Sequence, residues 1–167
     1  AAIDGVGATV TAQGVALALA AEHVRVTGSE LPWSPHWRPL ALGERPLALE
    51  LSREVPLETA LDDLARARGS GRAVVAKFRT GATPSWGWPN ENELALVITG
   101  ALERGLPFKL TGGMHHFLRA EHGGEPQHGL LNVLAATAVA LADPTRSDEV
   151  AAALAERDPL ALVPIVE

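Results

Sequence analysis

The sequence predicts an α/β fold made of parallel β-α repeats, because apolar runs of strand length alternate with helical patterns. The strand-length runs cover residues 46–51, 72–78 and 106–110. The helical patterns cover residues 57–69, 91–104 and 129–142. Strands that alternate with helices of about 12 residues pair in parallel through right-handed crossovers.

The length of the chain bears on which version of this fold it adopts. A complete (β/α)8 barrel needs at least about 200 residues, and the chain has 167. We therefore expect part of a TIM-barrel-like fold, organised as a single α/β domain over residues 1–167. In this interpretation the domain is the C-terminal part of a longer barrel-type chain. A small open doubly wound sheet is the alternative.

The first 50 residues are less regular than the rest. An alanine- and leucine-rich segment predicts a helix over residues 9–22, and the next apolar run predicts a short strand over 23–26. Four prolines and two tryptophans predict a loop over residues 29–46. The helix over 57–69 has apolar residues at helical spacing and is expected to stop at Gly69.

Capping residues delimit the later helices. Asn90 is suited to cap the helix over 91–104, because its side-chain oxygen accepts a backbone N–H of the first turn. Ser147 is expected to cap a last helix over residues 148–157. The C-terminal residues 161–167 predict a final strand, which Pro164 restricts to an edge or an extended tail.

Composition excludes several classes of protein. The formal net charge is −6, which disfavours nucleic acid as a partner. The absence of cysteine removes disulfides and thiolate zinc sites. Because no run reaches the roughly 18 apolar residues of a membrane span, and the N-terminus carries no basic signal-peptide region, we expect a cytoplasmic protein without membrane contact.

The two lysines are the most informative residues of the sequence. Lys77 and Lys109 each lie near the end of an expected strand, and each is followed by a Thr-Gly pair that opens a loop. The two segments are Lys77-Phe78-Arg79-Thr80-Gly81 and Lys109-Leu110-Thr111-Gly112-Gly113. Ligands bind at the carboxyl ends of parallel strands. We expect both amines and Arg79 to face one mouth, the alternative being two solvated lysines.

Four of the six histidines fall within fourteen residues of one another, in the segment that follows the strand of the second lysine. They are His115, His116, His122 and His128. One of them is expected to act as a general acid or base, with His115, His116 and His128 as the candidates. A metal site that includes Glu121 or Glu125 and a set of surface histidines are the alternatives; we expect neither metal nor cofactor.

Three further residues are candidate ligand contacts. Asn132 lies in the first turn of an apolar helix, where it is expected either to bind ligand or to tie down the loop around His128. Trp86 and Trp88 follow the Lys77 strand and are expected to form a lid, a subunit contact or an anchor that pins the loop to the core.

The motifs AKFRTG, GLPFKLTGGMHH and HGLLNVL resemble those of a functionally uncharacterised, largely actinobacterial family. Its members carry KxRTGG, GxPFKxTAGLHH and HGFLNV at these spacings, and the resemblance covers roughly residues 46–160. It implies a longer, barrel-like chain and a common set of positions, without an activity. Ala82 and Gly112 depart from the family pattern. The matched positions are Lys77, Arg79, Thr80, Gly81, Lys109, Thr111, Gly113, His115, His116, His128, Gly129 and Asn132.

Two functions follow from these residues. The first is a lyase-, aldolase- or isomerase-type enzyme that acts on a small anionic carbonyl compound, with Lys109 or Lys77 as a Schiff-base nucleophile. Arg79 and the backbone N–H groups of the Thr-Gly and Gly-Gly turns hold the anion, and a histidine moves protons. The second is a non-catalytic binding or assembly module, completed by a second copy or by a partner chain.

Overall fold

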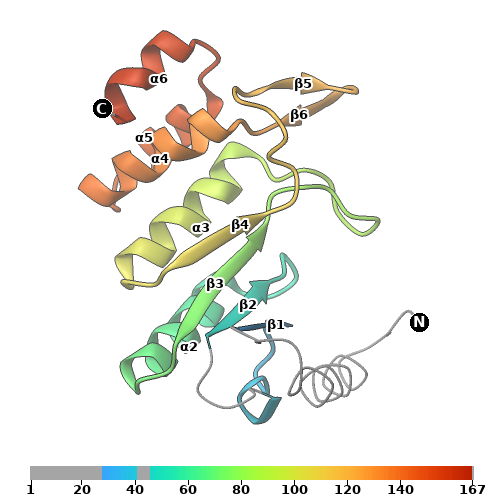
Figure 1. The fold of residues 1–167 in the computed structure, drawn as a ribbon, viewed down its shortest axis with the longest axis vertical. Helices are drawn as coiled ribbons and strands as arrows, with labels where there is room; N and C mark the ends of the chain where they lie inside the picture. The colour runs from blue at the N-terminus through green and yellow to red at the C-terminus, as the bar shows by residue number, and fades with distance from the viewer. Residues whose placement is uncertain (1–27, 41–45, 167) are drawn as a thin grey trace, which may run out of the picture. The chain divides into compact units, whose positions relative to one another are not determined.

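The computed structural model describes residues 28–40 and 46–166. The helix and strand expected over 9–26 lie outside this range. The described residues fall into two compact units, the first ending at Ala76 and the second beginning at Lys77. Strands β1 to β4 form a parallel sheet in the order β1-β2-β3-β4 (Figure 1), which confirms the α/β class. These strands form no closed barrel within the described ranges.

The first unit contains β1 (Ser29–Pro32), β2 (Leu47–Leu51) and α2 (Leu57–Gly69). Strand β2 and helix α2 are where the sequence predicts them. The prediction of a loop over 29–46 is wrong for its first residues, which form β1. This strand pairs in parallel with β2, with Ser29 opposite Leu47. The described part of that loop also holds a short 3-10 helix, η1 (Arg38–Leu40). Strand β1 has only four residues and lies at the edge of the sheet, where Pro32 is tolerated.

Strand β3 (Val74–Arg79), helix α3 (Glu91–Glu103) and strand β4 (Phe108–Thr111) confirm the next three predicted elements. Asn90 caps α3 as expected: its side chain accepts the backbone N–H of Glu93, and the Glu93 carboxylate accepts the backbone N–H of Asn90. This reciprocal capping fixes the point at which the loop after β3 turns into the helix.

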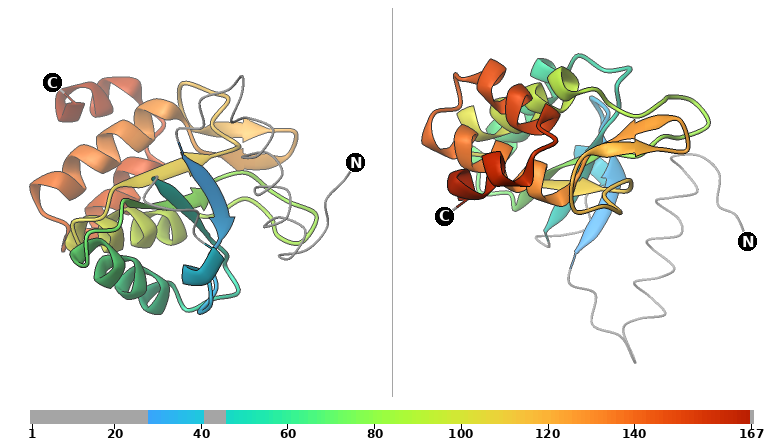
Figure 2. Two further views of the ribbon diagram at one scale, coloured as in Figure 1. Left: turned by 60° about the horizontal axis from the view of Figure 1, so that its bottom comes forward. Right: turned by 90° about the horizontal axis from the view of Figure 1, so that it is seen from above.

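The segment after β4 contains a hairpin that the sequence analysis missed. Strands β5 (Ala120–His122) and β6 (Glu125–Gln127) pair antiparallel across Gly123 and Gly124, which both have positive φ. A two-residue Gly-Gly turn between short polar strands is a recognised hairpin signal. Figures 1 and 2 show that this hairpin and the loop over 80–90 both extend beyond the carboxyl ends of β3 and β4.

Three helices complete the second unit: α4 (Leu130–Ala142), α5 (Ser147–Ala155) and α6 (Pro159–Val166). Helix α4 is as predicted. Ser147 does not cap α5, because Arg146 holds the cap position and Ser147 is already helical. None of the helices in the described part of the chain is long and apolar enough to span a membrane.

The strand expected over 161–167 is wrong, since these residues up to Val166 belong to α6. Asp158 begins this helix: its carboxylate accepts the backbone N–H of Leu160 at 2.9 Å. Pro159 takes the first helical position, where the missing N–H of proline costs nothing. The Asp-Pro pair therefore starts a helix and outweighs the disfavoured Pro164 within it.

The core of the second unit lies between helices. Helix α5 packs on both α3 and α4, and α4 also packs on α6. Leu94 and Ile98 of α3, Leu154 of α5 and Leu162 of α6 are at most 1% exposed. Each Å2 of apolar surface buried between these helices stabilises their packing by about 25 cal/mol. The packed helices in turn fix the segments that connect them to the strand ends.

Candidate functional site

The carboxyl ends of β3 and β4 lie side by side, because these strands are neighbours in the parallel sheet. The backbone N–H of Thr80 donates to the carbonyl oxygen of Thr111 at 2.9 Å. In a parallel pair, an N–H bonds to the carbonyl one residue before its opposite neighbour. Thr80 therefore lies opposite Gly112. These two residues are as far apart in the sequence as Lys77 and Lys109, so the same register pairs the two lysines.

This register places Lys77 opposite Lys109 and Arg79 opposite Thr111. Opposite residues of a parallel pair, and residues two apart on one strand, point to the same face of a sheet. These four side chains therefore share one face. Lys77 is only 9% exposed, whereas Lys109 is exposed. The lysines are on adjacent strands as expected, and their convergence on one cavity stays a prediction.

The two threonines of the repeated motif occupy different faces. Thr80 follows Lys77 by three residues and points away from it, whereas Thr111 follows Lys109 by two residues and shares its face. The hydroxyl of Thr80 is buried and donates to the carbonyl oxygen of Gly112. The hydroxyl of Thr111 is also buried but has no hydrogen-bond partner among the described residues.

The glycines after the two strands allow the backbones to touch. Gly113 has a φ of +81°, and a Cβ there would stand 2.7 Å from the Cα of Gly81. The same Cβ would stand 2.4 Å from the ring of Trp88. A side chain at Gly113 is therefore excluded both by backbone conformation and by space. The Trp88 ring therefore lies beside this contact of the two backbones, and the role of the loop tryptophans stays a prediction.

Two more buried polar atoms, in the segments that follow β3 and β4 along the chain, lack a partner among the described residues. They are the indole nitrogen of Trp86, in the loop after β3, and Nε2 of His122, in the hairpin after β4. Buried polar atoms in folded proteins are almost always hydrogen-bonded, so an exception calls for a water or a ligand. Thr111 is the last residue of β4, and Trp86 and His122 lie in the segments that follow β3 and β4.

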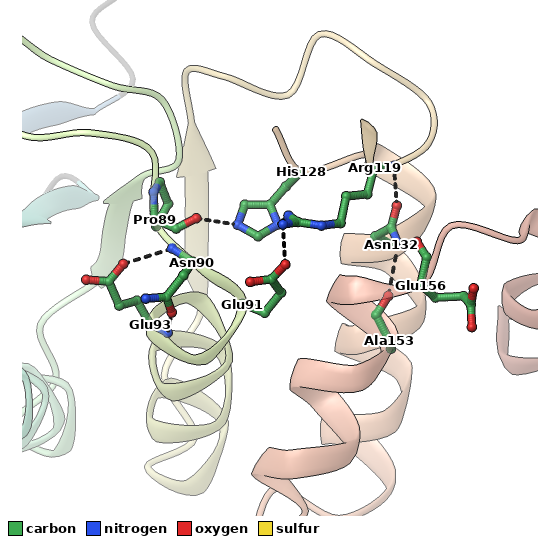
Figure 3. A network of polar contacts seen from close by, with 9 residues as sticks. All are labelled: Pro89, Asn90, Glu91, Glu93, Arg119, His128, Asn132, Ala153 and Glu156. Atoms are coloured by element: carbon green, nitrogen blue, oxygen red, sulfur yellow. Dashed lines mark hydrogen bonds and ion pairs between the residues drawn. The ribbon is translucent and has the colours of Figure 1, made fainter. Parts of the chain in front are cut away.

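His128 lies in a buried network of polar contacts (Figure 3). Its side chain is 1% exposed, and Nε2 lies 2.8 Å from the carbonyl oxygen of Pro89. Because a carbonyl only accepts hydrogen bonds, Nε2 carries the proton and donates it. Nδ1 then accepts a hydrogen bond from the Arg119 guanidinium at 3.3 Å. His128 thereby joins the loop after β3 to the segment after β4.

The surroundings of His128 favour its neutral form. Burial lowers the pKa of His128 below 6.5, and the positive charge of Arg119 acts in the same direction. The hydrogen bond with Pro89 and the charge of Glu91 oppose this shift without cancelling it. Both ring nitrogens are engaged, so these contacts make His128 a connector; its role as a catalytic acid or base stays a prediction.

Arg119 and Asn132 extend the network to the helices (Figure 3). The guanidinium of Arg119 forms an ion pair with Glu91 in the first turn of α3. The Asn132 side chain accepts the backbone N–H of Arg119 at 2.7 Å and donates to the carbonyl oxygens of Ala153 and Glu156. These contacts join the backbone at Arg119 to the end of α5, and the binding of a ligand by Asn132 stays a prediction.

Arg119 was not among the candidate residues, although the sequence holds a signal for it. It is the only arginine between Arg104 and Arg146, and it stands in the histidine-rich segment. A cation that is 8% exposed must be paired, because a buried unpaired charge is strongly destabilising. The partner, Glu91, lies in another element, so the pair itself cannot be read from local sequence.

His115, His116 and His122 do not form a ligand set with one another in the part of the chain that the structure describes. His115 is exposed, and the rings of His116 and His122 stack with their centroids 3.3 Å apart at an angle of 10°. Imidazole lone pairs lie in the ring plane, so two parallel stacked rings cannot direct them at one ion. Over residues 28–40 and 46–166, no three histidine, aspartate or glutamate side chains are placed to hold a metal.

The first unit contains a polar cluster of its own that the sequence analysis missed. The indole N–H groups of Trp33 and Trp37 both donate to the carboxylate of Asp63, at 3.1 and 2.7 Å. Burial opposes ionisation of Asp63, but these hydrogen bonds and the guanidinium of Arg38 hold its pKa below the ordinary value. The cluster anchors both tryptophans to α2, and Trp37 is fully buried.

Comparisons of the chain with protein-family models, with curated proteins and with solved structures gave no match. The family resemblance described above therefore stays a prediction. A function for the chain has to be inferred from the geometry of the strand ends and the segments that follow them.

Proposed function

We propose that the chain is a lyase-, aldolase- or isomerase-type enzyme that acts on a small anionic carbonyl compound. The observation that carries the proposal is the register of β3 and β4, which sets Lys77 opposite Lys109 near the carboxyl ends of the strands. Ligands of parallel α/β folds bind beyond these ends. Arg79 lies on the same face and adds a cation for the anionic group.

The proposed chemistry is formation of a Schiff base. The amine nitrogen attacks the substrate carbonyl carbon, and the carbonyl oxygen leaves as water, which gives an iminium ion that draws electrons from the neighbouring carbon. The amine must be neutral to attack, and burial and a neighbouring cation both disfavour its charged form. We propose Lys77 as the nucleophile, because it is the buried lysine of the pair; sequence order alone favours Lys109.

The proton transfers of this chemistry need a group that can both donate and accept near neutral pH. His115 and His116 follow the Gly112-Gly113 turn directly. His115 is exposed, and His116 is held by its contact with the His122 ring. We propose one of these two histidines for the proton transfer, since His128 uses both ring nitrogens in the buried network.

Borohydride trapping tests the proposal. The chain is incubated with a panel of small aldehydes and keto acids, the imine is reduced, and intact mass and peptide mapping locate the adduct. Trapping at Lys77 is expected, with loss of the adduct in Lys77→Arg and its retention in Lys109→Arg. Equal, slow modification of both lysines and of the N-terminal amine would contradict covalent catalysis.

For the scaffold, we propose a barrel-type arrangement. The four parallel strands follow one another in chain order. Doubly wound sheets instead reverse their strand order at a switch point, and strands β1 to β4 contain no such reversal. The sequential order is what a segment of a barrel requires, because each strand there is followed in space by the next one along the chain.

A second candidate is the assembly module, which the surface of α4 and α6 favours. Neither helix contains a charged residue. Their exposed apolar side chains are Leu130, Leu134, Leu141, Leu160, Val163, Ile165 and Val166. Apolar patches of this kind mark interaction surfaces. Light scattering after gel filtration separates the candidates: a dimer of the 17.5 kDa chain that Leu134→Glu dissociates favours assembly, and a monomer favours the enzyme.

A further inference from the structure

We infer that Arg79 and Thr111 form the subsite that binds the anionic group of the substrate, a carboxylate or a phosphate. The inference rests on the proposed function and assigns the two ends of its substrate to different residues. The lysines take the carbonyl end. The Arg79–Thr111 pair, two residues closer to the carboxyl ends of the strands, takes the anion.

The register brings the two residues together. Arg79 lies opposite Thr111, so their side chains leave neighbouring strands on the same face. The guanidinium of Arg79 lies against the turn that follows Thr111: a Cβ on Gly112 would stand 3.6 Å from its Nη1 atom. The cation is therefore held beside the end of β4.

The hydroxyl of Thr111 supplies the second argument. Its oxygen is buried and has no hydrogen-bond partner among the described residues. Leaving such a group without a partner costs about 1–3 kcal/mol. Thr80, the matching residue of the sequence repeat, has its hydroxyl bonded to the carbonyl of Gly112. Of the two threonines, Thr111 is thus the one whose hydroxyl needs an acceptor from outside the described residues.

The cation opposite Thr111, Arg79, favours an anion as that acceptor. Lys77, Arg79 and Lys109 are all on the face of Thr111. A carboxylate or phosphate oxygen accepts from a guanidinium and a hydroxyl at once, and hydrogen bonds to charged groups are the stronger kind. A water molecule also satisfies a hydroxyl, but unlike an anion it forms no ion pair with the Arg79 guanidinium.

The spacing of the two subsites limits the substrate. Two residues along a strand span about 6.6 Å, which separates the level of the lysines from that of Arg79 and Thr111. A substrate that reaches both must carry its anionic group several bonds away from its carbonyl carbon. We therefore expect phosphorylated or ω-carboxylated aldehydes and ketones, rather than compounds whose carboxylate is bonded directly to the carbonyl carbon.

Calorimetric titration of the full chain with inorganic phosphate and, separately, with acetate tests the subsite. Thr111→Val keeps the shape of the side chain and removes the hydroxyl, and we expect it to weaken binding of the preferred anion about tenfold, equal to about 1.4 kcal/mol. Thr111→Ser restores the hydroxyl and is expected to recover most of the affinity. Arg79→Met should weaken binding at least as much as Thr111→Val.

Arg66→Met is the charge-matched control, because Arg66 lies on α2 in the first unit and its side chain is 69% exposed. Unchanged affinity in this control, with losses in Thr111→Val and Arg79→Met, supports the subsite. The anion that binds more tightly identifies phosphate or carboxylate as the group bound. Absence of binding to the wild-type chain, or equal affinity in all variants, would overturn the inference.

The result can be told apart from the lysine test. Anion binding that depends on Thr111, together with failure of borohydride trapping, would retain the subsite and refute the covalent mechanism. Trapping at Lys77 without anion binding would retain the mechanism and refute the subsite. Melting temperatures of all variants, compared with that of the wild-type chain, verify that each one is folded.

Discussion

The carboxyl ends of β3 and β4 carry similar residues but use them differently. At the end of β3, the hydroxyl of Thr80 is buried and donates to the Gly112 carbonyl, so it stabilises the fold. At the end of β4, the hydroxyl of Thr111 is buried on the lysine face and has no partner among the described residues. A one-residue difference in spacing from the lysine sends the two threonines to opposite faces.

The comparison shows how a sequence repeat can mislead. Aligned by residue type, Thr80 matches Thr111; aligned by register, Thr80 matches Gly112, and Thr111 matches Arg79. The structural correspondence therefore pairs a cation with a hydroxyl across the two strands. A ligand group that binds between them meets one residue from each strand, which neither half of the repeat provides alone.

The contact between the backbones at Gly81 and Gly113 is where we expect a single substitution to lower the stability of the fold most. Gly113→Ala forces a Cβ into the Gly81 backbone and the Trp88 ring at a φ of +81°. We expect a loss of about 4 kcal/mol or more in the free energy of unfolding, since both strain and overlap contribute. Urea denaturation followed by circular dichroism measures it.

Gly124→Ala is the matched control for that substitution. Gly124 has a φ of +80°, and a Cβ there would meet nothing within 4 Å. Only the left-handed backbone is then penalised, at about 1–2 kcal/mol. The difference between the two variants isolates the contact of the loops. Equal losses in both would show that the two strand ends do not touch in this way.

The stability that the buried network around His128 gives to the fold is expected to depend on pH. The pKa of His128 is lowered in the folded chain relative to 6.5, so protons bind more readily to the unfolded chain. The stabilisation by neutral His128 is complete above about pH 6.5 and decreases as the pH falls further, until the folded-state pKa is passed. Urea denaturation between pH 5 and pH 8 tests this dependence.

Two variants test whether His128 is the residue that causes this pH dependence. His128→Gln removes the titrating ring, and we expect a flatter dependence of the free energy of unfolding on pH. His115→Gln removes an exposed histidine and is expected to keep the slope of the wild-type chain. If His115→Gln flattened the curve and His128→Gln did not, the assignment of the buried network as the pH-sensitive link would be wrong.

Much of the scaffold is predictable from the sequence because its signals are local. Apolar runs located β2, β3 and β4, helical spacing located α2, α3 and α4, and Asn90 marked the start of α3. Strand β1 was missed because four residues that include a proline carry no periodic pattern. The Gly123-Gly124 pair is a signal for the hairpin, but that segment was interpreted as a loop. The Asp158-Pro159 pair is a signal for the start of α6, but that segment was interpreted as a strand.

The site is less predictable because it depends on register and on contacts between distant segments. The sequence placed Lys77 and Lys109 on neighbouring strands, but it could not show that Arg79, rather than Thr80, is the counterpart of Thr111. The ion pair of Arg119 with Glu91 joins residues 28 positions apart in the sequence. Pairings of this kind follow from the packed fold and leave no local pattern.

The smallest expected effect tests the central comparison most directly: the free energies of unfolding of Thr80→Val and Thr111→Val in buffer without phosphate or carboxylate. Thr80→Val removes a buried donor from the Gly112 carbonyl and should cost about 1–2 kcal/mol. Thr111→Val replaces a hydroxyl without a partner among the described residues, and should remain within about 0.5 kcal/mol of the wild-type chain or exceed its stability. Equal costs for the two variants, or a larger cost for Thr111→Val, would contradict the assignment of one threonine to the fold and the other to a ligand.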